Sequence, residues 1–188
     1  LFGEDRQPST RYLLIPKVSS ENRSYLPVGF VTPEVVASGS ALIVPNADLY
    51  EFGVLSAVMH MAWMRYTCGR LESRYQYSSS LVYNNFPWPE NPTDKQRATI
   101  EAAAQDVLDA RARFPDATLA DLYDPIAMPP ALVKAHQKLD AAVDAAYGRK
   151  GFANDAARVA YLFELYSTYT SLLPADKPKR AKADTKSL

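Results

Sequence analysis

The chain has 188 residues, 47% hydrophobic and 22% charged, which is the composition of a folded globular protein rather than a disordered one. Its 21 basic and 21 acidic residues cancel, which argues against a uniformly basic nucleic-acid-binding surface. It shows neither an apolar run of the roughly 20 residues that a membrane-spanning helix needs nor a signal peptide. The single cysteine, Cys68, excludes an internal disulfide and a cysteine-based zinc cluster, so we expect a location in the reducing cytoplasm.

The first part of the chain, residues 1–91, has the pattern of a small β-rich domain. Branched and aromatic residues gather in short runs, which are separated by turn-like Ser, Gly and Asn residues. We expect strands at 11–18, 23–31 and 41–44, and a further extended stretch at 71–83.

One long helix is expected within this part, from Ala47 to Thr67. Asn46 or Asp48 can cap its start, and Gly69 can end it. Apolar residues recur at helical spacing, so one side of the helix should be buried. The residues on that side are Leu49, Phe52, Leu55, Met59 and Trp63.

The second part, residues 92–174, has an all-helical pattern. Thr93 and Gln96 form a capping box at the start of the first expected helix, which runs to about Arg113. Further helical segments are expected at 119–123 and 130–148, and from Asn154 or Asp155 to a stop at Pro174. The lysine-rich residues 175–188 are expected to form a disordered basic tail. The chain is therefore predicted to have an α+β fold in two domains.

No pattern of a catalytic, cofactor or metal site is found in the sequence. It has no glycine-rich nucleotide loop, no His/Glu metal spacing and no nucleophile elbow. His60 and His136 fall in expected helices, where packing is a more frequent role than catalysis. The segment Asn84–Trp88 superficially resembles the Asn/Asp-Pro-Pro-aromatic loop of amino-methyltransferases, but one proline follows its aromatic residue instead of two preceding it. We therefore expect this chain alone to be non-catalytic.

The segment 71–78 is the most informative stretch, because its side chains alternate between two faces if it is extended. Tyr75 and Tyr77 then project from one face and are expected to be buried against the helix that carries Trp63. The opposite face can hydrogen-bond to base edges in DNA. Its polar side chains are Glu72, Arg74, Gln76 and Ser78. From the spacing alone, a solvated strand face is the more frequent explanation.

Longer stretches of the sequence resemble one protein family. The run that starts at Phe52 and ends in CGRLESRYQYSSSLVYNNFPWP is similar to the C-terminal region of MmeI-like DNA methyltransferases, single-chain enzymes of type II restriction–modification systems. The segments 122–130, 134–140 and 141–148 resemble the sequence that follows in that family. The match extends from about Arg11 to Leu173, and its combined motifs are specific.

The resemblance implies a target-recognition domain followed by a C-terminal helical domain. In the parent protein, a methyltransferase domain that uses S-adenosylmethionine to methylate adenine N6 would precede Leu1, and many members add an endonuclease domain. The implied partners are double-stranded DNA and that upstream domain, and the cofactor belongs to the parent enzyme rather than to this fragment.

The family's base-contacting positions are carried over to Glu72, Arg74 and Gln76, and the loop Ser38–Ser40 adds Ser40 to them. We assign contacts with the DNA backbone to Arg65, Arg70 and Ser78.

Two alternatives remain open. The chain could be a stand-alone specificity subunit that binds DNA for a separate enzyme, or a protein-interaction domain that does not bind nucleic acid, which the neutral charge favours. In the helical part, some basic side chains could contact phosphates, and a solvated helix face explains them equally well. These side chains are Arg111, Arg113, Arg149 and Lys150.

Overall fold

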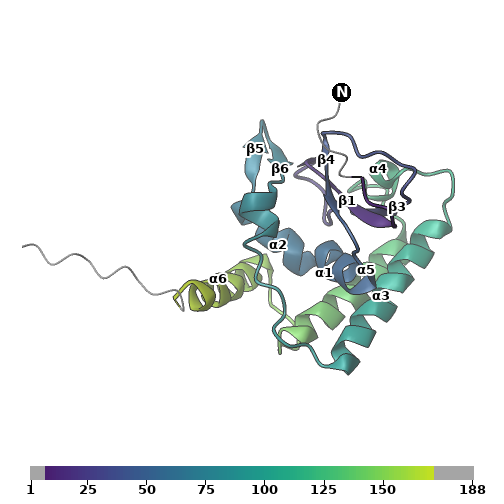
Figure 1. Ribbon diagram of the computed structural model, residues 1–188. Helices are drawn as coiled ribbons and strands as arrows, with labels where there is room; N and C mark the ends of the chain where they lie inside the picture. Colours follow the sequence, from purple (N-terminus) through teal and green to yellow (C-terminus); the bar gives the residue numbers. More distant parts are fainter. Residues whose placement is uncertain (1–6, 172–188) are drawn as a thin grey trace, which may run out of the picture.

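The computed structural model of the protein describes residues 7–171, which form two small antiparallel sheets and a set of helices (Figure 1). Strands occur in the first part of the chain and the second part is helical, so the predicted α+β fold is confirmed. The predicted tail, and the stop of the last helix at Pro174, lie outside the described residues. Within the described range, no helix is long and apolar enough to cross a membrane.

Each sheet has three strands. The first has the order β3 (Gly29–Val31), β1 (Tyr12–Pro16) and β4 (Ala41–Val44). The second has the order β2 (Val18–Ser19), β6 (Arg74–Gln76) and β5 (Gly69–Leu71). The expected strand at 41–44 is confirmed, whereas 11–18 is divided at Lys17 between the two sheets and 23–31 keeps only its last three residues.

The expected helix from Ala47 to Thr67 is two helices, α1 (Leu49–Ser56) and α2 (Val58–Thr67), so the prediction of one long helix is wrong. Ala57 between them is extended, with φ −82° and ψ 158°. The reason is tertiary: the Val58 N–H, which starts α2, donates to Oδ1 of Asp140 at 2.8 Å instead of to the preceding turn. Asp48, rather than Asn46, caps α1.

The helical part matches its predicted elements closely. It contains α3 (Asp94–Ala112), α4 (Leu119–Leu122), α5 (Pro130–Ala146) and α6 (Asp155–Ser171). The capping box at the start of α3 is present, with the Gln96 N–H donating to Oγ1 of Thr93 at 3.2 Å and the Thr93 N–H donating to Oε1 of Gln96 at 2.9 Å. These elements are encoded locally, which is why the sequence predicts them.

The two parts share one hydrophobic core. Helix α1 lies so close to α3 that a Cβ atom on Gly53 would be 2.7 Å from Cγ2 of Ile100. Arg111 is buried and donates to the Val28 carbonyl at 2.8 Å and to the Tyr123 hydroxyl at 2.9 Å. The expectation that Arg111 contacts a phosphate is therefore wrong, and the division at residue 91 stays a prediction.

Candidate nucleic-acid interface

The segment with most of the predicted site residues is a hairpin rather than one extended strand. Strands β5 and β6 pair with Leu71 opposite Arg74, and Glu72 and Ser73 form the turn between them. Glu72 has a φ of 57°, in the left-handed region, which costs a non-glycine residue about 1–2 kcal/mol. The prediction that Glu72 and Arg74 lie two positions apart on one face of an extended strand over 71–78 is therefore wrong.

Within β6 the side chains alternate as predicted. Arg74 and Gln76 are exposed, whereas Tyr75 and Tyr77 are 6% and 3% exposed. The Tyr77 hydroxyl lies 2.9 Å from Nε2 of His60 in α2. The burial of both tyrosines is confirmed, and Tyr77 fastens the hairpin to α2.

Opposite charges lie side by side at the tip of the hairpin. The Arg74 guanidinium donates to the Glu72 carboxylate at 2.8 Å, and both side chains are exposed. Arg70 donates to the Ser73 carbonyl at 2.9 Å and stacks over the Tyr75 ring, with its guanidinium carbon 4.2 Å from the ring centre. The two arginines are therefore held in defined positions on the surface.

Glu21 is a further charged residue of this tip. A hydrogen bond with Ser73 lowers the pKa of the Glu21 carboxyl, and the charges of Arg70 and Arg74 lower it further. Two carboxylates, of Glu21 and Glu72, thus balance two guanidinium groups. The tip offers directional donors and acceptors with little net charge, which suits contacts to base edges better than contacts to phosphates alone.

Lys17 joins the two sheets, although no sequence pattern singles it out. Its backbone N–H donates to the Ser40 carbonyl at 2.9 Å, and its carbonyl accepts from the Tyr77 N–H at 2.7 Å. Its ammonium group donates to the Gly39 carbonyl at 2.8 Å. One residue therefore holds the loop that contains Ser40 beside the end of β6.

Two adjoining hollows, of about 600 and 410 Å³, open between this loop and the segment after β6. Lys17, Leu42 and Ser79 line both of them. The loop residues Ser38 and Gly39 border the larger hollow, and Gln76 and Ser78 border the smaller one. The structure thus brings the Ser40 loop, Gln76 and Ser78 to one surface, although they are far apart in the sequence.

Two residues assigned to the DNA backbone have partners within the chain. Ser78 caps the π-helical turn η1 (Ser79–Tyr83) by accepting from the Leu81 N–H at 3.4 Å. The Arg65 guanidinium pairs with Asp155 of α6 and also donates to a backbone carbonyl. A contact between Arg65 and DNA would have to replace these interactions.

Both histidines are core residues. Burial lowers the pKa of His60 and of His136 to about 3, so both rings are neutral at physiological pH. His136 Nε2 lies 2.6 Å from the Tyr123 hydroxyl, and its ring stacks on Tyr25 at 4.0 Å between centres. Among residues 7–171, no group of three or more His, Cys, Asp or Glu could hold a metal ion.

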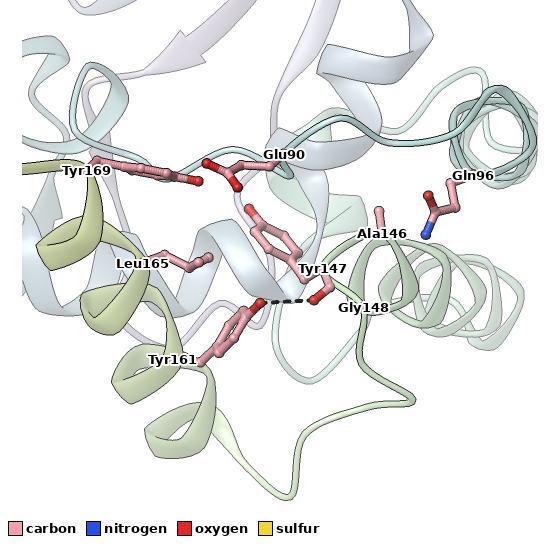
Figure 2. Close-up of a pocket in the computed structure, with 8 residues that line it drawn as sticks. All are labelled: Glu90, Gln96, Ala146, Tyr147, Gly148, Tyr161, Leu165 and Tyr169. Atoms are coloured by element: carbon pink, nitrogen blue, oxygen red, sulfur yellow. Dashed lines mark hydrogen bonds between the residues drawn. The ribbon is translucent and has the colours of Figure 1, made fainter. Parts of the chain in front are cut away.

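Another hollow, of about 320 Å³, lies between α6 and the end of α5 (Figure 2). The Tyr161 hydroxyl donates to the Tyr147 carbonyl at 3.0 Å, and the Tyr147 hydroxyl donates to the Pro87 carbonyl at 2.7 Å. Burial, together with the neighbouring Glu90 carboxylate, raises the pKa of Tyr169 to about 12. The tyrosines here fasten α6 and the 84–92 segment to α5, and we do not place a ligand among them.

Comparison with known families covers most of the chain. The family model described as "MmeI, target recognition domain" matches residues 1–90, and the one described as "MmeI, C-terminal domain" matches residues 92–174. The chain belongs to the MmeI family. The resemblance drawn from the sequence is therefore confirmed.

Two relatives of this MmeI-family chain show how much of a longer protein it represents. DNA methyltransferase A of Bacillus subtilis (strain 168) is 40% identical over 167 residues, which cover 88% of this chain and 19% of that protein. The type IIL restriction-modification enzyme MmeI, solved in complex with DNA, is 55% identical with a TM-score of 0.85, over 88% of this chain and 22% of that one. The chain thus spans about a fifth of the length of these relatives.

Proposed function

We propose that this chain is the DNA-recognition part of a longer MmeI-family enzyme and selects the sequence on which that enzyme acts. The observation that carries the proposal is the junction at Lys17, which gathers the Ser40 loop and the hairpin β5–β6 on one surface. The solved MmeI, similar to this chain in sequence and fold, is bound to DNA, which supports the same partner here.

Base contacts are proposed for the exposed side chains of this surface. Arg74 can donate two hydrogen bonds to guanine, Glu72 can accept from cytosine, and Gln76 can pair with adenine. Ser40 lies in the loop beside them, and its hydroxyl can donate a hydrogen bond to a base edge or to a bridging water molecule.

Contacts to the DNA backbone are proposed for Arg70 and Ser78, and the Lys17 ammonium adds a cation between the two segments. Arg65 was assigned the same role from the sequence, but its pairing with Asp155 favours an internal role. Phosphate contacts hold a protein in register on the duplex, whereas the base contacts carry the sequence information.

The rest of the polypeptide is proposed to bind S-adenosylmethionine and to methylate adenine N6 after that base is flipped out of the duplex. The two hollows beside Lys17 do not fit the cofactor, because neither is lined by an acidic side chain for its ribose hydroxyls. The chain would contact the upstream methyltransferase domain and act on DNA in the bacterial cytoplasm.

The test uses the complete polypeptide. Methylation-aware sequencing of the host genome gives the modified motif, and two duplexes, one with the motif and one with the motif scrambled, are then titrated at several salt concentrations. We expect preference for the motif and an affinity that falls as salt rises, because phosphate neutralisation releases counterions. Equal affinity for both duplexes would refute sequence recognition, and no affinity at low salt would favour a protein-interaction domain.

A further inference from the structure

The hairpin β5–β6 is attached to the end of α2, and α2 is not a rigid continuation of α1. The extended residue Ala57 separates the two helices. Helix α1 is held against α3, where Gly53 leaves no room for a side chain. The direction of α2 therefore depends on its tertiary contacts, which include the hydrogen bond to Asp140 at its start and the Arg65–Asp155 pair near its far end.

The start of α2 receives its cap from a distant part of the chain. Val58 is the first residue of α2, so its N–H has no acceptor within the helix, and Ala57 provides no side-chain cap. Oδ1 of Asp140 in α5 accepts this N–H at 2.8 Å, and Oδ2 accepts the Tyr25 hydroxyl at 2.7 Å. A negative charge at the first turn of a helix is also electrostatically favourable. Asp140 thus joins α2, α5 and the segment before β3.

The other end of α2 is coupled to the hairpin. The Cys68 N–H donates to the Met64 carbonyl at 2.9 Å, and β5 begins at the next residue, Gly69. The bond between His60 and Tyr77, the residue after β6, ties the hairpin back to the first turn of the helix. In Figure 1 the hairpin stands at the end of α2 that is remote from α3 and α5. The hairpin is therefore fixed to α2, and its orientation follows that of the helix.

We propose that Asp140 is a positioning residue, which sets the direction in which α2 presents the hairpin β5–β6 to DNA. The inference rests on the proposed function of that hairpin. Helix α2 has 10 residues, and its length is about 15 Å, so a tilt of about 5° at Ala57 moves the far end by about 1 Å. Hydrogen bonds to bases tolerate only a few tenths of an ångström, so such a tilt is enough to break them.

Two variants remove the same hydrogen bond from opposite sides. Asp140→Ala removes the acceptor. Val58→Pro removes the donor and keeps the carboxylate, and proline suits the first position of a helix that follows an extended residue. If Asp140→Ala does not fold, Val58→Pro decides the question.

The measurement is a ratio of two DNA affinities of the complete polypeptide. The first is for a duplex that contains the motif found by methylation-aware sequencing, and the second is for duplexes in which one base pair of that motif is substituted. We expect both variants to lower this ratio by about tenfold, the size of one good base contact, while affinity for unrelated DNA stays the same. A loss of stability alone does not produce this result, because a smaller folded fraction lowers every affinity by the same factor.

Two controls separate the cap from the other bond of Asp140. Asp140→Asn keeps an oxygen acceptor for Val58 and should retain most of the ratio. Tyr25→Phe removes only the second hydrogen bond and should leave the ratio unchanged. An unchanged ratio in both Asp140→Ala and Val58→Pro, even with a lower melting temperature, overturns the inference. Absence of any preference in the unmodified protein would refute the proposed function instead.

Discussion

Glu72 and Arg74 form an ion pair across the turn of the hairpin β5–β6, with their charged atoms 2.8 Å apart. Both side chains are largely exposed, so the pair contributes only about 0–1 kcal/mol to stability. Its larger effect is on geometry, because each partner restricts the rotamers of the other. In the proposed function, the ion pair would hold the two side chains in a defined position before they contact bases.

Exchange of this pair should change the recognised sequence at one position. We expect the double variant Glu72→Lys, Arg74→Asp to alter the preference at one C·G pair and to leave the other positions intact. Each polar contact of this kind is worth about 1–3 kcal/mol of discrimination. The measurement is the methylated motif of the complete polypeptide and of the double variant. An unchanged motif with uniformly lower activity would show that Arg74 contacts only the backbone.

Tyr77 should be a structural residue. We expect Tyr77→Ala to cost about 2–4 kcal/mol of unfolding free energy, as for other buried large side chains. Tyr77→Phe is the matched control, because it removes only the hydroxyl that faces His60 and should cost about 1 kcal/mol. Denaturant unfolding measures both. A Tyr77→Ala protein of normal stability that no longer binds DNA would mean that the ring contacts the bases.

Asp140 should make stability depend on pH. Burial raises the pKa of Asp140 from 3.8 to about 6, although hydrogen bonds with Val58 and Tyr25 and the charge of Arg158 act in the opposite direction, and Asp144 adds to the rise. At a pH between 3.8 and about 6, Asp140 is therefore more often protonated in the folded state than in the unfolded state. This carboxyl therefore lowers stability as pH rises from about 4 to about 6, by up to about 3 kcal/mol.

The variant Asp140→Asn isolates this effect, because other carboxyls titrate equally in both proteins. The difference in unfolding free energy between the variant and the unmodified protein is measured in denaturant at pH 4 and pH 7. Relative to the unmodified protein, we expect the variant to be more stable at pH 7 than it is at pH 4. A difference that does not change with pH would show that the carboxyl titrates normally.

Gly53 should not tolerate a methyl group. Gly53→Ala improves helix propensity by about 1 kcal/mol, but the new Cβ would lie 2.7 Å from Cγ2 of Ile100, and overpacking costs about 1–3 kcal/mol. We expect net destabilisation. Adding Ile100→Leu, which removes Cγ2, should recover part of the loss in a double-variant cycle. Simple additivity of the two changes would mean that the clash is relieved elsewhere.

The helical part could be predicted from the sequence because its signals are local. Thr93 and Gln96 lie three positions apart and cap α3 with each other. Apolar residues at helical spacing then predict which side of each helix is buried. The break at Ala57 has no such signal, since the apolar pattern continues through it and the acceptor that interrupts the helix, Asp140, belongs to α5.

The candidate interface could be predicted only in part. Tyr75 and Tyr77 revealed the buried face of β6, because alternation is a property of the strand itself. The turn at Glu72 and Ser73 has no such signal, since hairpin turns usually carry glycine, asparagine or aspartate. Lys17 shows no local pattern, and its importance arises only when two sheets meet.

The shared core determines which pieces of this architecture can be transplanted between relatives. A chimera joined near residue 91 must preserve the bonds from Arg111 to the Val28 carbonyl and from Tyr25 to Asp140, as well as the close approach at Gly53. The tip of the hairpin faces solvent and carries none of these constraints. In the proposed function, a new sequence preference would need changes in only a few exposed side chains, on a scaffold that remains the same.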